Sequence, residues 1–195
     1  KMLTLRIAQN QDVKFLVDCI NKDYEINDHY MDVSWWTKAV LEKNDITLDT
    51  IKKYLNPKFP DQELIIVNNN NKDVGFFSQD LDMCNMVLGA TCFVHPRACK
   101  MSILKLVKAC TVRGILYGLE NSFESVEFNT WAGLITHTVK AIIPSLKEYK
   151  IRDNYRICES SFDLIKSSIN KSELIDRFSI KMFDSSNMLF FMEDK

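Results

Sequence analysis

Residues 86–131, MVLGATCFVHPRACKMSILKLVKACTVRGILYGLENSFESVEFNTW, decide the fold of this chain. Residues 86–94 form an apolar run that predicts a strand, and His95-Pro96 ends it because proline cannot donate to a sheet ladder. A short basic turn leads into residues 103–119, whose apolar side chains recur at helical spacing. In residues 125–131 one side of the alternation is Val126, Phe128 and Thr130 and the other is Glu127 and Asn129, which predicts a strand. A strand that runs directly into a helix start predicts an anion site, because free amides and the helix dipole point there.

The chain before this stretch predicts a strand, a helix, a variable region and an antiparallel meander. Residues 3–7 alternate, and Asn10 is a good N-cap for the helix that follows. Residues 26–60 are helical and aromatic, and large aromatics such as Trp35 and Trp36 are mainly core material. A run of asparagines predicts a tight turn, since asparagine tolerates left-handed geometry. The meander strands are residues 63–67, 74–78 and 86–94.

The chain after the central stretch predicts a further helix, a sixth strand and an extension. Residues 132–143 read as a short helix and residues 152–158 as the sixth strand. The extension, residues 162–195, contains a helix and a hairpin built from 178–183 and 188–192. We expect this hairpin to complete the C-terminal half of the sheet, with an interaction surface as the alternative, because phenylalanine and methionine are dense there.

Length and composition indicate one soluble globular domain over residues 1–195. The net charge of −1 gives no general attraction to nucleic acid or to anionic lipid. Aromatic and basic residues do not interleave on any one strand, and no apolar run approaches the roughly 18–20 residues of a membrane span. We therefore expect a cytoplasmic protein that binds neither nucleic acid nor membrane.

The cysteines and histidines predict reduced thiols and no metal site. Of the six cysteines none forms a Cys-x-x-Cys pair, and the three histidines are scattered without ligand spacing. Cys92 and Cys110 lie within apolar patterns, so we expect both to be buried free thiols.

The order of elements and one motif resemble the GNAT superfamily of N-acetyltransferases. In that family a Val-x-Pro ends the fourth strand, and an Arg/Gln-x-x-Gly-x-Gly/Ala turn then cradles the pyrophosphate of acetyl-CoA. This chain has Val94-His95-Pro96 followed by Arg97-Ala98-Cys99-Lys100-Met101-Ser102, so Arg97 matches and Lys100 replaces the first glycine. The resemblance implies an α/β (α+β) fold with a mixed, mainly antiparallel sheet of six to seven strands flanked by helices.

The resemblance also implies a site for acetyl-CoA as co-substrate, between the fourth and fifth strands. It further implies that residues 26–60, with Trp35 and Trp36, lie over the acceptor-substrate site, which is the alternative to a purely structural cover. The residues it assigns to the cofactor are Phe93, Val94, Arg97, Cys99, Lys100, Met101, Ser102 and Asn129. For the arginine and lysine the alternative is a solvated helix face that also includes Lys105 and Lys108, and for Asn129 it is an outward polar position of an alternating strand. Gly89 predicts either the bulge that splays the strands or a close packing point.

Three residues are candidates for proton transfer. A general base is available at Glu127, on the fifth strand, or at His95, which has the alternative of a simple turn residue. The family's general acid is a tyrosine in an Asn-x-x-Ala-x-x-x-Tyr pattern. Here Ser145 stands at the tyrosine position, and Tyr149 lies one turn later.

Two functions remain open. One is a divergent acyl-CoA-dependent N-acetyltransferase that acts on an amine of a protein or small molecule. The other is an inactive GNAT-like protein used for binding or assembly with a protein partner. The segment from Gly133 to His137 resembles GNAT-like internal virion proteins of tailed phages, which implies a phage protein placed in the host cytoplasm or the virion. The Lys100 and Ser145 departures favour the second function, and Arg97 favours the first.

Overall fold

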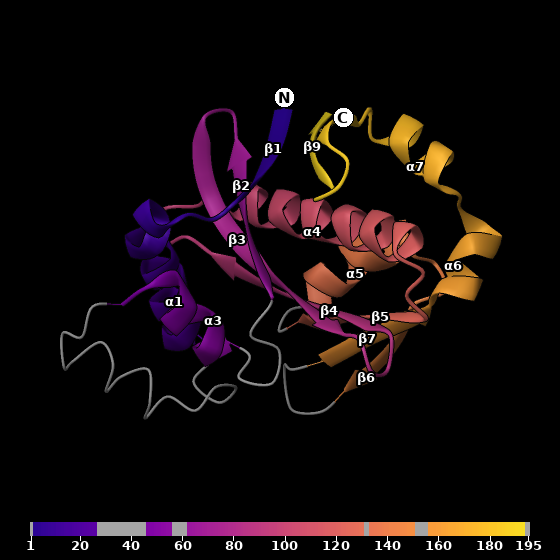
Figure 1. Ribbon diagram of the computed structural model, residues 1–195, viewed down its shortest axis with the longest axis horizontal. Coiled ribbons are helices and arrows are strands. Elements are labelled where there is room, and N and C mark those ends of the chain that lie inside the picture. Colours follow the sequence, from indigo (N-terminus) through magenta and orange to yellow (C-terminus); the bar gives the residue numbers. More distant parts are fainter. Residues whose placement is uncertain (1, 27–45, 56–61, 131–132, 151–155, 194–195) are drawn as a thin grey trace.

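The computed structural model describes residues 2–26, 46–55, 62–130, 133–150 and 156–193, and Trp35, Trp36 and Trp131 lie outside these ranges. The described residues of the first half of the chain form helices, a 3-10 turn and strands (Figure 1). These elements are β1 (Met2–Ile7), η1 (Asn10–Asp12), α1 (Val13–Ile26), α3 (Leu48–Leu55), β2 (Glu63–Asn69), β3 (Lys72–Asp82) and β4 (Val87–Val94).

The second half begins with the longest described helix. Its elements are α4 (Lys100–Glu120), β5 (Ser125–Thr130), α5 (Gly133–Ile142), β6 (Lys147–Lys150), β7 (Arg156–Ser161), α6 (Phe162–Ser168), α7 (Lys171–Arg177), β8 (Lys181–Asp184) and β9 (Leu189–Glu193). None of the described helices is both long and apolar enough to cross a membrane.

Within the described residues the strands form one sheet in the order β6-β7-β5-β4-β3-β2-β1-β9-β8. Every neighbouring pair is antiparallel except β4 and β5, which run parallel because α4 carries the chain back across the sheet. The predicted mixed, mainly antiparallel sheet flanked by helices is therefore confirmed, as is the meander of β2, β3 and β4. Asn70 and Asn71 turn between β2 and β3 with φ of 50° and 66°, as the asparagine run predicted.

The predicted strand count of six to seven is too low, because the sheet has nine strands. One difference is the antiparallel pair of β6, residues 147–150, and β7, residues 156–161. The sequence predicted a single strand at 152–158, of which residues 152–155 lie outside the described residues. The other is the C-terminal hairpin, which joins the sheet as β8 and β9.

The hairpin joins the opposite edge of the sheet from the one expected. Strand β9 pairs with β1, where Leu3 faces Met192, so the hairpin extends the N-terminal half (Figure 1). Both of these side chains are fully buried, and Phe190 is buried with them. Burial of these apolar side chains against the first strand explains the choice of edge.

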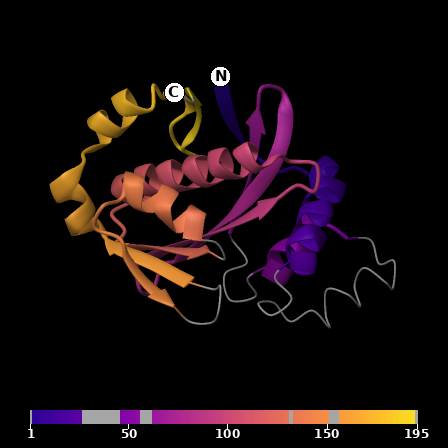
Figure 2. The same ribbon diagram turned by 180° about the vertical axis from the view of Figure 1, so that it is seen from behind.

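Two apolar layers cover opposite faces of the sheet. Helix α4 runs across the centre of one face, with α5 on the same side (Figure 2). It packs on the side chains of Leu88, Ala90 and Val126. Helices α1 and α3 pack on the other face, where the rings of Phe76 and Phe93 stack 4.8 Å apart. Alternate residues of each strand therefore serve different layers, as the pleat of a strand requires.

Helix α4 is buried on almost all sides, which corrects the expectation of a solvated basic face. Lys105 is 7% exposed and donates to the Asn69 side chain over 3.4 Å, and Arg113 is fully buried. The Arg113 guanidinium pairs with Glu63 and donates to the Asn187 carbonyl over 2.8 Å, in the turn of the C-terminal hairpin. The outer side of α4 is covered because the hairpin and α7 pack over it, which the sequence around α4 does not reveal.

Gly89 forms neither a bulge nor a close packing point. The register of β4 runs without a shift through Gly89 on both sides, and a Cβ there would lie 3.5 Å from the Asp80 Cβ, an ordinary contact. Gly75 of β3 is the close approach, since a Cβ there would lie 2.4 Å from the Phe93 carbonyl oxygen. Glycine is therefore required at 75, where β3 and β4 meet beneath α4.

Candidate active site

Strands β4 and β5 part at one defined point. Their parallel pairing runs from Val87 and Ser125 to Thr91 and Asn129. The next three residues of β4, Cys92–Val94, pair with β3 alone among the described strands. Their outer edge therefore offers backbone donors and acceptors beside β5, in the place where Phe93 and Val94 were expected to meet the cofactor.

The chain then turns from this free edge straight into α4. The Val74 carbonyl accepts from the His95 amide over 3.0 Å, and the His95 carbonyl accepts from the Ala98 amide over 2.9 Å. Cys99 is the extended N-cap residue, and the first turn of α4 carries no acidic side chain. Arg97 and Lys100 are exposed there, so cationic side chains stand at the positive end of a 21-residue helix. Such a helix start attracts an anion.

Cys99 and Ser102 interact with each other at this helix start. Their Sγ and Oγ atoms lie 3.3 Å apart, and the Ser102 amide donates to the Cys99 carbonyl over 2.8 Å. Hydrogen bonds from the Ser102 hydroxyl, and then from backbone amides of the same turn, lower the pKa of the Cys99 thiol. Ser102 is buried and interacts with Cys99 through its hydroxyl and its amide, whereas Cys99 and Met101 are exposed. The exposed groups at the helix start are thus Arg97, Cys99, Lys100 and Met101.

His95 is held in place as part of the turn. Its ring stacks on Phe15 of α1 with centroids 4.8 Å apart, and its Nδ1 accepts from the Arg97 amide over 3.2 Å. Burial, followed by the positive charge of Arg97, lowers its pKa. A neutral ring that accepts at Nδ1 carries its proton on Nε2, so neither nitrogen keeps a free lone pair. This geometry favours the turn role over that of a general base.

Glu127 lies on the face of the sheet opposite α4. Its neighbours Val126 and Phe128 are buried beneath α4, so the alternation of β5 turns Glu127 the other way. It pairs with Gly89 of β4 and with Glu159 of β7, two residues before the strands part. Partial burial, and then the charge of Glu159, raises the pKa of its carboxyl. A carboxylate with a raised pKa next to the parting point is suited to accept a proton.

The main chains of Asn129 and Tyr149 lie on one register line, and their side chains lie outside the described residues. Asn129 pairs with Thr91 on one side and with Ile157 on the other, and Ile157 pairs in turn with Tyr149. Helix α5 ends at Ile142, so Tyr149 is on edge strand β6 and not one turn along that helix. Its main chain is therefore connected to the point where β4 and β5 part through the register of the sheet.

Ser145, at the family's tyrosine position, has a structural role. Its Oγ lies 2.7 Å from the Oγ of Ser160 on β7, in the turn that follows α5. A serine hydroxyl is much less acidic than the phenol of tyrosine, so Ser145 cannot take the role of general acid. The general acid implied by the resemblance is therefore not found at that position.

Sequence reasoning missed two features around the parting point. Asp80, Gly89, Glu127 and Glu159 fall in one register row across four strands, which depends on strand register that no local pattern gives. Cys92 is only partly buried, against the expectation, whereas Cys110 is buried as expected; both are free thiols. Across the described residues there is no cluster of three or more metal-binding side chains.

Several solved structures of similar shape are N-acetyltransferases. One from Staphylococcus aureus Mu50 has a TM-score of 0.53 and 14% identity, over 83% of this chain and 98% of that chain. A spermidine N-acetyltransferase variant from Vibrio cholerae has a TM-score of 0.54 and 11% identity, over 86% and 98%. PaiA N-acetyltransferase from Thermoplasma acidophilum, in complex with coenzyme A, has a TM-score of 0.50 and 10% identity, over 82% and 98%.

These likenesses show that the chain has the GNAT fold. No family model matches the sequence, and no curated protein matches it.

Proposed function

We propose that this chain, which has the GNAT fold, binds an acyl-CoA where β4 and β5 part and transfers the acyl group to an amine. The observation that carries the proposal is the free edge of Cys92–Val94, which leads directly into the cationic start of α4. An extended pantetheine arm can pair with such an edge as an added strand would. A pyrophosphate suits the helix start.

The contacts we assign to the cofactor follow the order of the chain. Backbone groups of Phe93 and Val94 hold the pantetheine arm, with Asn129 on the facing strand. Amides of Cys99, Lys100 and Met101 hold the pyrophosphate, and Arg97 and Lys100 add charge-assisted contacts. Lys100 is exposed at the first position of the helix, so its side chain has room to turn toward a phosphate. PaiA, which shares the fold, holds coenzyme A.

Glu127 is the residue we assign as general base. It accepts a proton from the acceptor amine, directly or through one water, and the amine nitrogen then attacks the thioester carbonyl carbon. The carbon–nitrogen bond forms, the carbon–sulfur bond breaks, and the coenzyme A thiolate leaves and takes up a proton. We keep Tyr149 as the candidate donor of that proton, because it shares a register line with the parting point.

The acceptor we propose is a cationic amine. Glu127, Glu159 and Asp80 share one row on the same face of the sheet, which places carboxylates around the base. Carboxylates attract ammonium groups and offset part of the cost of removing them from water. Spermidine, the acceptor named for the enzyme from Vibrio cholerae, is a small molecule of this class.

A second function, binding or assembly without catalysis, is favoured by one observation. Ser145 is tied to Ser160 at the position where active relatives place their acid. A GNAT-like protein without that acid would keep the fold and use its surface to hold a protein partner.

Calorimetric titration of acetyl-CoA into the wild type and Lys100→Gly distinguishes these functions. If Lys100 binds phosphate, the variant weakens binding by about 1–2 kcal/mol, the scale of a charge-assisted hydrogen bond, and added salt weakens the wild type. Lys14→Gly is the matched control, because Lys14 is a highly exposed lysine in the first turn of another helix. Tighter binding by Lys100→Gly would make Lys100 a steric block. If neither protein binds acetyl-CoA at millimolar concentration, the enzyme function is excluded and only the second function, binding or assembly without catalysis, remains.

A further inference from the structure

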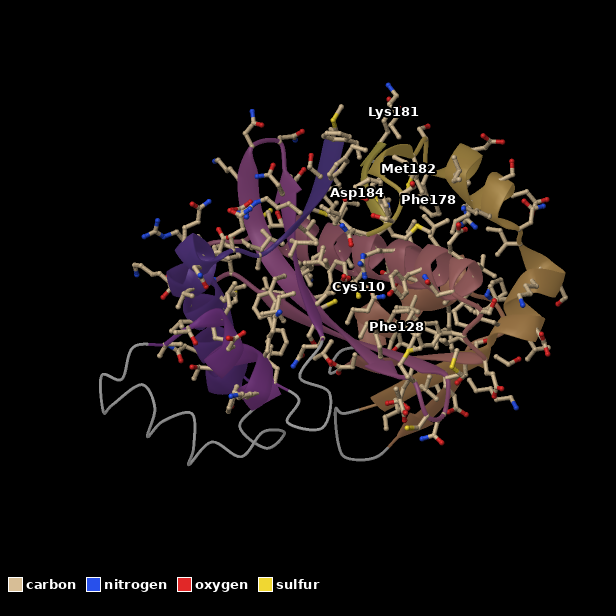
Figure 3. All side chains as sticks on the ribbon, viewed as in Figure 1. Cys110, Phe128, Phe178, Lys181, Met182 and Asp184 are labelled. Atoms are coloured by element: carbon tan, nitrogen blue, oxygen red, sulfur yellow. The ribbon has the colours of Figure 1, made fainter. Side chains whose placement is uncertain are left out.

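The side chains of Cys92 and Cys110 meet in the interior of the molecule. Cys110 lies midway along α4, and Figure 3 shows it at the centre, with Phe128 of the sheet nearby. Cys92 lies on β4, immediately after the last residue paired with β5, and packs against the cluster that contains Cys110. Leu106 and Gly114, one turn before and after Cys110, lie over Gly75 beside Val94 and over Leu88, so Cys110 faces β4 between them. Cys92 alternates onto the same face of β4 as Leu88 and Ala90, which brings the two free thiols together.

The two thiols differ in their access to solvent. Cys110 is 1% exposed, whereas Cys92 is partly exposed beside the free edge of β4. Burial, and then the neighbouring Cys92 thiol, raises the pKa of Cys110 well above its ordinary value. A small reagent therefore meets Cys92 first, and Cys110 stays protonated and in reserve behind it.

We propose that Cys92 and Cys110 are a redox-active thiol pair, in which Cys92 reacts with a low-molecular-weight disulfide and Cys110 resolves the product. The Cys92 thiolate attacks one sulfur of the reagent and forms a mixed disulfide, and the expelled thiolate takes up a proton from water to give the first thiol. Cys110 then loses its proton to the departing thiolate and attacks the Cys92 sulfur, which releases the second thiol. The two cysteines are oxidised to one disulfide, and the reagent is reduced to two thiols.

The disulfide joins the free edge of β4 to the middle of α4. The two sulfur atoms would be bonded at about 2.05 Å, which fixes Cys92, at the free edge of β4, to the helix. On the proposed function, this cross-link competes with the pantetheine arm, which would lie along the same edge. Oxidation would then lower acyl-CoA binding, and bound acyl-CoA would shield Cys92.

The test removes the two exposed cysteines and follows the remaining ones. In a Cys84→Ser, Cys99→Ser background, the thiols left are Cys19, Cys92, Cys110 and Cys158, of which only Cys92 is not buried. The folded protein is treated with oxidised glutathione, then denatured, and its thiols and masses are measured. The expected result is loss of two thiols, no retained glutathione, and a peptide cross-linked between Cys92 and Cys110.

Two variants separate resolution from simple modification. In the same background Cys110→Ala should retain one glutathione on Cys92, and Cys92→Ser should lose no thiol. Alanine is small and apolar, so it suits the buried position, and thermal unfolding checks that each variant is folded. Retained glutathione on Cys92 while Cys110 is present, or a folded protein with all four thiols unreacted, would overturn the proposal.

A parallel reaction with acetyl-CoA present tests the link to the proposed function separately, since acetyl-CoA has no free thiol to interfere. Slower formation of the disulfide is expected if acyl-CoA lies over Cys92. An unchanged rate would contradict that placement of the ligand and leave the thiol pair established.

Discussion

At the scale of single residues, the candidate site rests on side chains whose surroundings differ from those that sequence suggested. Glu127 and His95 were equal candidates for the base, and burial lowers the pKa of His95 while it raises that of Glu127. The stacking of His95 on Phe15 joins β4 to α1, a contact between residues far apart in the sequence. Such pairings depend on tertiary packing, so no spacing rule reveals them.

Glu127→Gln should separate catalysis from stability. Since the pKa of Glu127 is raised in the folded protein, folding favours its protonated form, and its stabilising effect is lost as pH rises from the unfolded pKa through the folded pKa. Glutamine avoids that loss, so the variant should unfold at a higher temperature than the wild type at pH 7.5, with the gap closing at pH 4. Acetyl transfer should fall by about 10²–10⁴-fold.

Glu124→Gln, at an exposed position just before β5, is the control for both measurements. It should leave transfer and the pH dependence of unfolding near wild type. Full activity of Glu127→Gln would rule out Glu127 as the base.

Cys99 should be the most reactive thiol of the chain at neutral pH. Its pKa is lowered by the Ser102 hydroxyl and by amides at the helix start, which raises the thiolate fraction. Iodoacetamide at pH 7 should label Cys99 before exposed Cys84, as mass spectrometry of short exposures would show. Ser102→Ala should slow labelling of Cys99 and leave Cys84 unchanged. Equal rates at the two cysteines in the wild type would contradict this role of the helix start.

At the scale of elements, local pattern predicted the central unit well. The strand at 86–94, the helix after it and the strand at 125–131 appear as β4, α4 and β5, because an apolar run, a proline stop and a helical stripe are local signals. Helix α4 starts at Lys100, three residues before its apolar stripe, so part of the predicted turn is its first turn. The parting of β4 and β5 was expected at a bulge, but it arises where pairing stops after Thr91.

The close contact of β3 with β4 at Gly75 should be sensitive to a single methyl group. Gly75→Ala places a Cβ against the Phe93 carbonyl and the Leu106 side chain, so it should lower the free energy of unfolding by about 1–3 kcal/mol. Gly89→Ala, on the adjacent strand, meets only an ordinary contact and should change it by less than about 1 kcal/mol. Urea denaturation of both variants checks this, and equal losses would contradict the packing described.

At the scale of the whole molecule, the mixed, mainly antiparallel class of the sheet could be predicted from the sequence. The number of strands and the edge that the C-terminal hairpin joins could not. The hairpin at 178–192 was recognisable from alternation and a turn, yet its partner strand was not, because β1 lies almost the full chain length away. Arg113 shows the same limit. It lies mostly off the apolar stripe of its helix, and it is buried because the distant hairpin closes over α4.

The central claim is that an acyl-CoA lies along the free edge of β4 and against the start of α4. Hydrogen exchange of backbone amides, measured with and without saturating acetyl-CoA, tests it most directly. The account predicts slower exchange at residues 92–94 and 99–101, with the C-terminal hairpin unchanged. Unchanged exchange at both segments, or protection confined to other parts of the sheet, would contradict it.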